Sequence, residues 1–111
     1  MPYQVALVYE VKATLFRVLG HPARVRILEL LRDGERSVGA LQAELELDSG
    51  GTSQHLAALR RIGLVTSRRD GTSVYYRVGD DGVFDLLAAG RAIITRRLST
   101  EQSLLQELES E

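Results

Sequence analysis

The sequence predicts a mainly α-helical domain that carries one small β-hairpin, an α+β fold in a single unit. Apolar residues recur at helical spacing through most of the 111-residue chain, but between residues 64 and 78 the pattern becomes that of two short strands. No linker or repeat divides the chain, and its length suits one domain. Hydrophobic residues make up 44% and charged residues 26%, which is the composition of an ordinary globular domain.

Two helices are expected before residue 35. The first covers residues 5–19, where apolar side chains follow a helical period until Gly20 interrupts it. Pro22 suits the first turn of the second helix, and His21 stands at its capping position. The second helix is expected to stop near Asp33 and Gly34.

A third and a fourth helix are expected on either side of a short turn at residues 46–48. Ser37 is a suitable cap for the third helix. Either Asp48 or Ser49 caps the fourth helix, which ends at Gly63, a favourable residue just beyond a helix C-terminus.

The hairpin and the last helix follow. Residues 64–69 and 73–78 are rich in β-forming side chains and flank Asp70-Gly71, a pair typical of hairpin turns. Asp80 and Asp81 are expected to start the last helix, because acids suit the positive end of a helix dipole. Its apolar stripe covers residues 83–98, and residues 99–102 resemble a capping box, which leaves open a kink or a restart there.

The order of four helices, two strands and one helix is that of a winged helix-turn-helix. Residues 37–63 would form the helix-turn-helix and residues 64–78 the wing of one domain that spans residues 1–111. The apolar stripes of the first and last helices exceed what the short central elements can cover. We therefore expect a homodimer in which residues 1–19 and 80–111 form the dimerisation helices.

Charge is unevenly distributed along the chain, although the net charge is only −1. Residues 49–77 contain five arginines and one aspartate, whereas residues 79–111 contain three arginines and seven acids. A basic surface built from the middle of the chain favours a nucleic-acid partner. Arginines spread around a solvated surface are the alternative that the charge pattern alone leaves open.

Several classes of protein are excluded or disfavoured. The chain has no cysteine, so disulfides, thiolate metal sites and cysteine nucleophiles are excluded. No glycine-rich phosphate loop, Gly-x-Ser-x-Gly motif or paired-histidine helix is present, and we do not expect an enzyme. The apolar runs are too short to span a membrane, and the N-terminus lacks the basic region of a secretory signal. A cytoplasmic protein without a membrane partner is expected.

Three stretches in register resemble the ArsR/SmtB (arsenic-repressor) family of bacterial winged-helix regulators. They read LGHPARVRIL at residues 19–28, SQHLAALRRIGLV at residues 53–65, and RRDG at residues 68–71 followed by VYY at residues 74–76. The resemblance extends from about residue 13 to residue 98. It implies a homodimer, formed by the first and last helices, that represses transcription by occupying double-stranded operator DNA.

The candidate DNA contacts lie on the fourth helix and the wing. They are Ser49, Thr52, Ser53, Gln54, His55, Arg60, Arg68, Arg69 and Thr72. Residues at the start of the fourth helix can enter the major groove, where a glutamine reads adenine and hydroxyls pair with several bases. Arginines near the wing tip can enter a narrow minor groove or bind phosphate.

Some of these candidates have alternative roles. Thr52 and Ser53 are also suited to capping the backbone, and His55 to packing rather than facing DNA. Strand alternation places Arg68 and Arg69 on opposite faces, so only one of them is expected to reach a groove.

The start of the fourth helix departs from the family pattern. Gly50 and Gly51 stand where the family usually has hydroxyl side chains, so fewer groups remain to read bases. Each glycine also weakens helix initiation by roughly 1 kcal/mol relative to alanine. DNA shape would then contribute more to sequence selectivity.

Many members of the family bind a metal ion through cysteines of the third helix or a carboxylate–histidine set on the last helix. The corresponding positions here hold Ser37 and Ala40 on the third helix, and Asp80, Gly82, Ile93 and Arg96 on the last. A tight site needs three or four correct ligands. We expect no cofactor and neither of these metal sites, while weak metal binding through His21 or His55 is left open.

Two functions of different classes are compatible with these observations. The first is a dimeric repressor released from its operator by an unidentified signal. The second is a winged-helix interaction module whose main partner is another protein, with DNA binding secondary. The basic segment at residues 60–77 favours the first function. The missing metal ligands leave room for a separate sensor protein that carries the signal.

Overall fold

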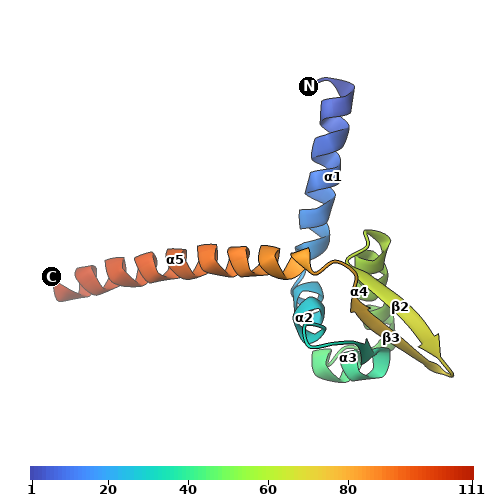
Figure 1. Cartoon of the computed structure of the whole chain (residues 1–111). Helices are drawn as coiled ribbons and strands as arrows, with labels where there is room; N and C mark the ends of the chain where they lie inside the picture. The colour runs from blue at the N-terminus through green and yellow to red at the C-terminus, as the bar shows by residue number, and fades with distance from the viewer. The chain divides into compact units, whose positions relative to one another are not determined.

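The computed structural model describes all residues from 1 to 111, in two compact units, Met1–Asp80 and Asp81–Glu111 (Figure 1). The elements run in the order α1 (Tyr3–Leu19), α2 (Pro22–Leu30), β1 (Arg36–Ser37), α3 (Val38–Leu45), α4 (Ser49–Arg61), β2 (Val65–Asp70), β3 (Ser73–Val78) and α5 (Gly82–Ser110). The predicted mainly helical fold with a winged helix-turn-helix order is confirmed, and one strand, β1, was not predicted.

The predicted capping residues begin three of the helices. His21 Nδ1 and Ser37 Oγ each accept a hydrogen bond of 3.1 Å from a backbone N–H in the first turn of α2 and α3. At α4, where the sequence left two candidates, Asp48 is the cap, and its Oδ1 accepts from Gly51 N at 2.6 Å. Each side chain satisfies an N–H that has no partner inside its own helix.

Gly63 ends α4 as predicted. It has a positive φ of 81°, and the next residue, Leu64, donates its N–H to Leu59 O at 3.0 Å. A left-handed residue at this position is the usual device for turning a chain out of a helix, and glycine adopts it without strain. The turn delivers the chain directly into the wing.

The sheet has three antiparallel strands in the order β1-β3-β2. β1 pairs with β3 through Arg36↔Tyr76 and Ser37↔Tyr75. Two residues are too few to produce a periodic pattern, which is why the sequence did not predict this strand. Because β1 is an edge strand, the connection between α2 and β1 lies at one edge of the sheet, and β3 separates it from β2.

The hairpin turn lies one residue later than predicted. Asp70 pairs with Ser73 inside the ladder, so the loop consists of Gly71 and Thr72 rather than Asp70-Gly71. Gly71 has a φ of 62°, the conformation that a tight hairpin turn requires at its first loop position. The register is set by the core, because the buried Val65 pairs with Val78.

The core of the first unit lies among α2, α3, α4 and the start of β2. Its largest fully buried apolar side chains are Ile27, Leu28, Leu41, Leu56, Leu59 and Val65. Burial of each such side chain contributes about 1.5–3 kcal/mol. α1 has no buried residue, and Val11 and Phe16 are 73% and 59% exposed.

α5 is one continuous helix of 29 residues, so the kink or restart left open at residues 99–102 does not occur. Thr100 Oγ1 and Ser103 Oγ each donate at 3.0 Å to the carbonyl four residues earlier, and Arg97 Nε contacts Glu101 Oε1 at 3.1 Å. These local bonds satisfy the polar side chains within the helix, so none of them caps a new one. α5 begins at Gly82, immediately after the two predicted aspartates.

Several large apolar side chains of α5 are exposed, among them Ile94, Leu98 and Leu108 at 57–68%. No helix in the chain has both the length and the apolar content needed to cross a membrane.

Candidate nucleic-acid interface

α4 is the second helix of the helix-turn-helix, and one of its sides is polar and exposed. The chain leaves α3 at Glu46, whose backbone is left-handed with a φ of 55°, and enters α4 after a short turn. Leu56 and Leu59 anchor the inner side of α4 at 1% and 0% exposure. Ser53 and Gln54 lie on the outer side and are exposed, as base-reading residues must be.

Thr52 is not available for DNA contact, contrary to the prediction. Its side chain is fully buried, and its Oγ1 donates a hydrogen bond to Asp48 O at 3.0 Å. The buried hydroxyl therefore has its partner within the turn that precedes α4, which agrees with the backbone role considered as the alternative. The correction follows from helical geometry, since residue 52 lies on the side that carries Leu56 and Leu59.

His55 is half-buried and, through Arg24, connects α4 with α2 and with the end of α1. Its Nδ1 accepts a hydrogen bond from Arg24 Nε at 3.2 Å, and its ring centre lies 4.2 Å from that of His21. Arg24 in turn donates to Val18 O at 3.3 Å. Burial, followed by the charges of His21 and Arg24, lowers the pKa of His55. The structure therefore favours the packing role of His55 over a DNA-facing one.

The two histidines, His21 and His55, each accept a hydrogen bond at the same ring nitrogen, Nδ1. Nδ1 of His21 accepts from Ala23 N, and Nδ1 of His55 accepts from Arg24 Nε. A neutral ring that accepts at Nδ1 carries its proton on Nε2, so a metal ion on either nitrogen would break one of these bonds or displace that proton. No group of three or more His, Asp or Glu side chains suited to a metal ion occurs in the chain.

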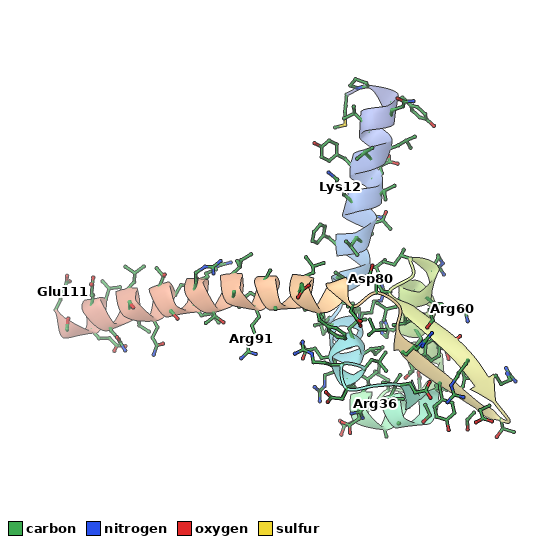
Figure 2. All side chains as sticks on the ribbon, in the orientation of Figure 1. Lys12, Arg36, Arg60, Asp80, Arg91 and Glu111 are labelled. Carbon is green, nitrogen blue, oxygen red and sulfur yellow. The ribbon has the colours of Figure 1, made fainter.

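The end of α4 is connected to the wing. Arg60 lies beside the hairpin (Figure 2), and its Nη1 donates to Ser67 Oγ on β2 at 3.2 Å. Because strand residues alternate, Arg69 shares a face of β2 with Ser67, whereas Arg68 points to the opposite face. Arg69 is exposed and has no ion-pair partner in the structure.

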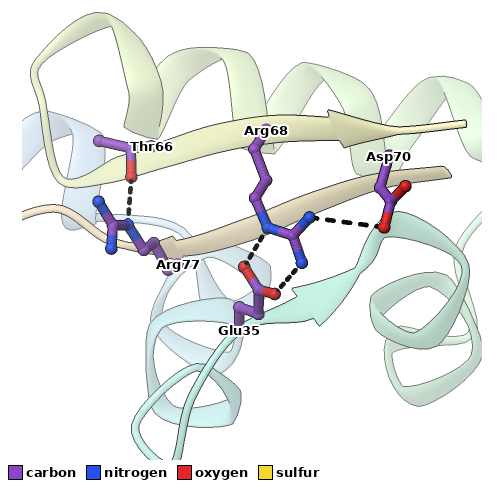
Figure 3. A network of polar contacts seen from close by, with 5 residues as sticks. All are labelled: Glu35, Thr66, Arg68, Asp70 and Arg77. Carbon is purple, nitrogen blue, oxygen red and sulfur yellow. Dashed lines mark hydrogen bonds and ion pairs between the residues drawn. The ribbon is translucent and has the colours of Figure 1, made fainter.

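Arg68 is held by acids on the opposite face of the wing (Figure 3). Its Nε donates to Glu35 Oε2 at 3.0 Å, its Nη2 forms an ion pair with Glu35 Oε1, and its Nη1 lies 3.8 Å from Asp70 Oδ2. The guanidinium also lies 4.7 Å from the centre of the Tyr75 ring. The hydrogen bond lowers the pKa of Glu35 and raises that of Arg68, so both groups stay charged at neutral pH.

The other predicted contact residues are exposed at the ends of these elements. Ser49 is the first residue of α4, and Thr72 is the second residue of the hairpin loop. The structure therefore brings Ser49, Ser53, Gln54 and Arg60 together on α4, with Arg69 and Thr72 on the adjoining hairpin. Sequence reasoning did not consider Glu35, because nothing local marks a lone acid in a connecting segment.

A helix-turn-helix with a polar outer side, followed by a hairpin with basic side chains, defines a winged helix-turn-helix protein of the DNA-binding class. Proteins of this class place the second helix of the motif in the major groove of DNA.

Comparison with known proteins identifies the family. Residues 21–67 match the family described as bacterial regulatory protein, arsR family. The HTH-type transcriptional regulator Rv0081 of Mycobacterium tuberculosis is 44% identical over 101 residues, which cover 90% of this chain and 89% of that protein. The chain belongs to the arsR family, and the resemblance seen in its sequence motifs is confirmed.

Solved structures agree with this assignment. The crystal structure of Rv0081 from M. tuberculosis superposes with a TM-score of 0.78 and covers 85% of this chain and 95% of that chain. A solution structure of a homodimeric winged helix-turn-helix DNA-binding domain from Mycobacterium bovis has 32% identity and a TM-score of 0.76, covering 88% and 91% of the two chains. The biofilm growth-associated repressor of Agrobacterium fabrum is 40% identical over 81 residues, 73% of this chain and 69% of that protein.

Proposed function

We propose that this protein is a homodimeric repressor that occupies double-stranded operator DNA through α4 and the β2–β3 wing. The observation that carries the proposal is the continuity of one exposed surface, from Ser53 and Gln54 on the outer side of α4 to Arg60, which is bonded to Ser67 of the wing. This surface offers groups for bases and groups for phosphates, which are the two kinds of contact that a specific regulator makes.

The proposed contact residues fall into two groups, those that read bases and those that bind phosphates. Gln54 reads adenine through its amide, and Ser53 donates to or accepts from a base edge in the major groove. Ser49 and Thr72 bind phosphate oxygens through their hydroxyls. Arg60 and Arg69 bind phosphates, and Arg69 at the wing tip also suits a narrow minor groove.

The homodimer is proposed from α1 and α5. Both helices carry large exposed apolar side chains, including Val11 and Phe16 on α1 and Leu98 and Leu105 on α5. A relative is described as homodimeric, which supports the same state here. Sedimentation at micromolar concentration should give a species of twice the chain mass, and a monomer alone would contradict the proposal.

The direction of regulation is proposed from a named relative. The A. fabrum protein is a repressor, and a protein that occupies an operator blocks transcription by excluding the polymerase. Release requires a signal, and the two histidines of this chain are engaged in structural hydrogen bonds. A separate sensor protein is therefore one source of the signal, and a small ligand is the other. The proposed function requires the cytoplasm of a bacterial cell.

The test is a titration of labelled DNA from upstream of the protein's own gene, and of a shuffled duplex, at several salt concentrations. Replacing Ser53 and Gln54 by alanine should weaken operator binding most, by about 1–3 kcal/mol for each base contact in each half-site. Arg69→Ala should weaken binding to both duplexes by a similar factor. It should also reduce the slope of log affinity against log salt concentration by about 0.9 for each phosphate that the arginine no longer neutralises. Arg26→Ala removes the same charge from the exposed side of α2 and is the matched control.

Two outcomes would contradict the proposal. If the Ser53/Gln54 variant lost affinity equally for both duplexes, α4 would not be reading bases. If no variant changed DNA binding, the chain would be the winged-helix interaction module considered as the alternative. Protected half-sites should lie about one helical turn apart, as expected for two α4 helices related by a dimer axis.

A further inference from the structure

The geometry points to Glu35 as a built-in competitor of DNA: its carboxylate occupies the Arg68 guanidinium and withholds it from backbone phosphates. Glu35 thereby removes Arg68 from the arginines of the wing that are available to phosphate, and lowers both the affinity and the salt dependence of DNA binding. This inference rests on the proposed DNA-binding function.

Glu35 reaches Arg68 across the whole width of the sheet. It lies in the connection between α2 and β1, whereas Arg68 lies on β2, and β3 separates these two strands. The pair spans β3 above Tyr75, which is the direct cross-strand partner of Arg68. Strand alternation places Arg68 on the face opposite Ser67 and Arg69, and the contact with Glu35 holds its guanidinium over β3 toward β1. A released side chain can extend past the outer edge of β2, which is an edge strand, toward a DNA backbone.

The edge of the Arg68 guanidinium formed by Nε and Nη2 is occupied by Glu35 and is closed to a phosphate. Nε and Nη2 are both engaged by Glu35, and Nη1 lies near Asp70. A phosphate binds the same two-pronged edge of a guanidinium as a carboxylate does, so the two ligands exclude each other. A phosphate approaching from the third side would also meet the negative charge of Asp70.

The pair can nevertheless open. The side chains of Arg68 and Glu35 are 52% and 34% exposed, and an ion pair so accessible to water is weak. An open pocket of about 290 Å³ adjoins it, lined by Glu35, Thr66, Ser67, Arg68, Tyr75 and Arg77. Arg77, which donates to Thr66 Oγ1 at 3.2 Å (Figure 3), adds a second positive charge near Glu35 and lowers its pKa further, after the larger effect of the Arg68 hydrogen bond. Loss of the Glu35 charge would therefore free Arg68 without opening the core.

The test compares Glu35→Gln with Asp33→Asn, using the operator and shuffled duplexes. Asp33 is exposed in the same connection and makes no ion pair, so its substitution changes the net charge equally. Glu35→Gln should tighten binding to both duplexes and steepen the salt dependence by about 0.9 per protomer relative to Asp33→Asn. With this difference in slope, the ratio of the DNA affinity of Glu35→Gln to that of Asp33→Asn falls about 3.5-fold per protomer as the salt concentration rises from 50 to 200 mM.

Arg68 provides the second half of the test. Arg68→Ala alone should change DNA binding much less than Arg69→Ala, and the gain from Glu35→Gln should vanish in the Glu35→Gln/Arg68→Ala double variant. Glu35→Ala also removes the carboxylate that pairs with Arg68, so it should tighten DNA binding in the same way. In the absence of DNA, the Arg68 Nε–H resonance should shift in Glu35→Gln and not in Asp33→Asn, which reports the loss of the pair directly.

The outcomes separate this inference from the function on which it rests. If the unmodified protein fails to bind the operator, the proposed function is wrong. If it binds, but Glu35→Gln and Asp33→Asn have equal affinities and equal salt slopes, only the competition is wrong. A loss of affinity on Arg68→Ala as large as that on Arg69→Ala would also overturn it, because Arg68 would then already be in contact with DNA.

Discussion

The two adjacent glycines at the start of α4 should respond differently to alanine. A Cβ on Gly50 would lie 3.7 Å from Asp48 Oδ1, an ordinary van der Waals contact. A Cβ on Gly51 would lie 3.1 Å from the same atom, which is the oxygen that caps the helix by accepting from Gly51 N. The added methyl group at residue 51 must therefore shift the capping carboxylate by a few tenths of an ångström.

The expected magnitudes follow from this contact. Alanine in place of glycine stabilises a helix by about 0.5–1 kcal/mol, because the unfolded chain has fewer conformations to lose. Gly50→Ala should show this gain. Gly51→Ala has the same gain, but it also weakens the Asp48 cap, whose complete removal costs about 0.5–2 kcal/mol. Its net effect should be near zero or destabilising.

Urea unfolding measures both variants, and one fixed protein concentration keeps the contribution of dimerisation equal between them. Asp48→Ala provides the control in a double-mutant cycle. Without the capping carboxylate, both glycine substitutions should stabilise the protein by similar amounts. The reasoning is refuted if Gly51→Ala stabilises the unmodified protein as much as Gly50→Ala does.

Three further predictions concern the first unit. Leu59→Ala should lower the free energy of unfolding by about 2–5 kcal/mol in urea, because it leaves a cavity at a fully buried position. Gly79→Ala should cost about 1–3 kcal/mol in the same assay, since the new Cβ would lie 2.5 Å from a backbone carbonyl oxygen; a neutral result would show that the backbone there yields easily. Because the folded-state pKa of His55 is lowered, its contribution to stability is present above about pH 6.5 and is lost as the pH falls through the lowered pKa. Thermal unfolding from pH 7 to 5 should show this decline, and His55→Gln should remove it; an unchanged decline would assign it to another group.

Local sequence signals determined most of the secondary structure. The caps at His21, Ser37 and Asp48 and the glycine at residue 63 act on neighbours within about four residues, so their effect can be read from the order of residues. The order of the predicted elements indicated the helix-turn-helix and the wing, and the family motifs indicated the regulatory class. For the site, the placement of Ser53 and Gln54 in the first turns of α4 followed from the cap that starts the helix, but the burial of Thr52 beside them did not.

The register and the partners of individual side chains depended on contacts between distant residues. The pairing of the buried Val65 with Val78 moved the hairpin turn by one residue, and the pairing of β1 with β3 brought Glu35 within reach of a guanidinium 33 positions away. Sequence predicted that only one of Arg68 and Arg69 would reach DNA, yet the position of Glu35 favours Arg69 for that role. Helix caps and periods depend on near neighbours, whereas the partner of a charged side chain depends on the strand order of the folded sheet. The sequence by itself therefore determined the elements and their class, and the tertiary structure decided which side chains are free to act.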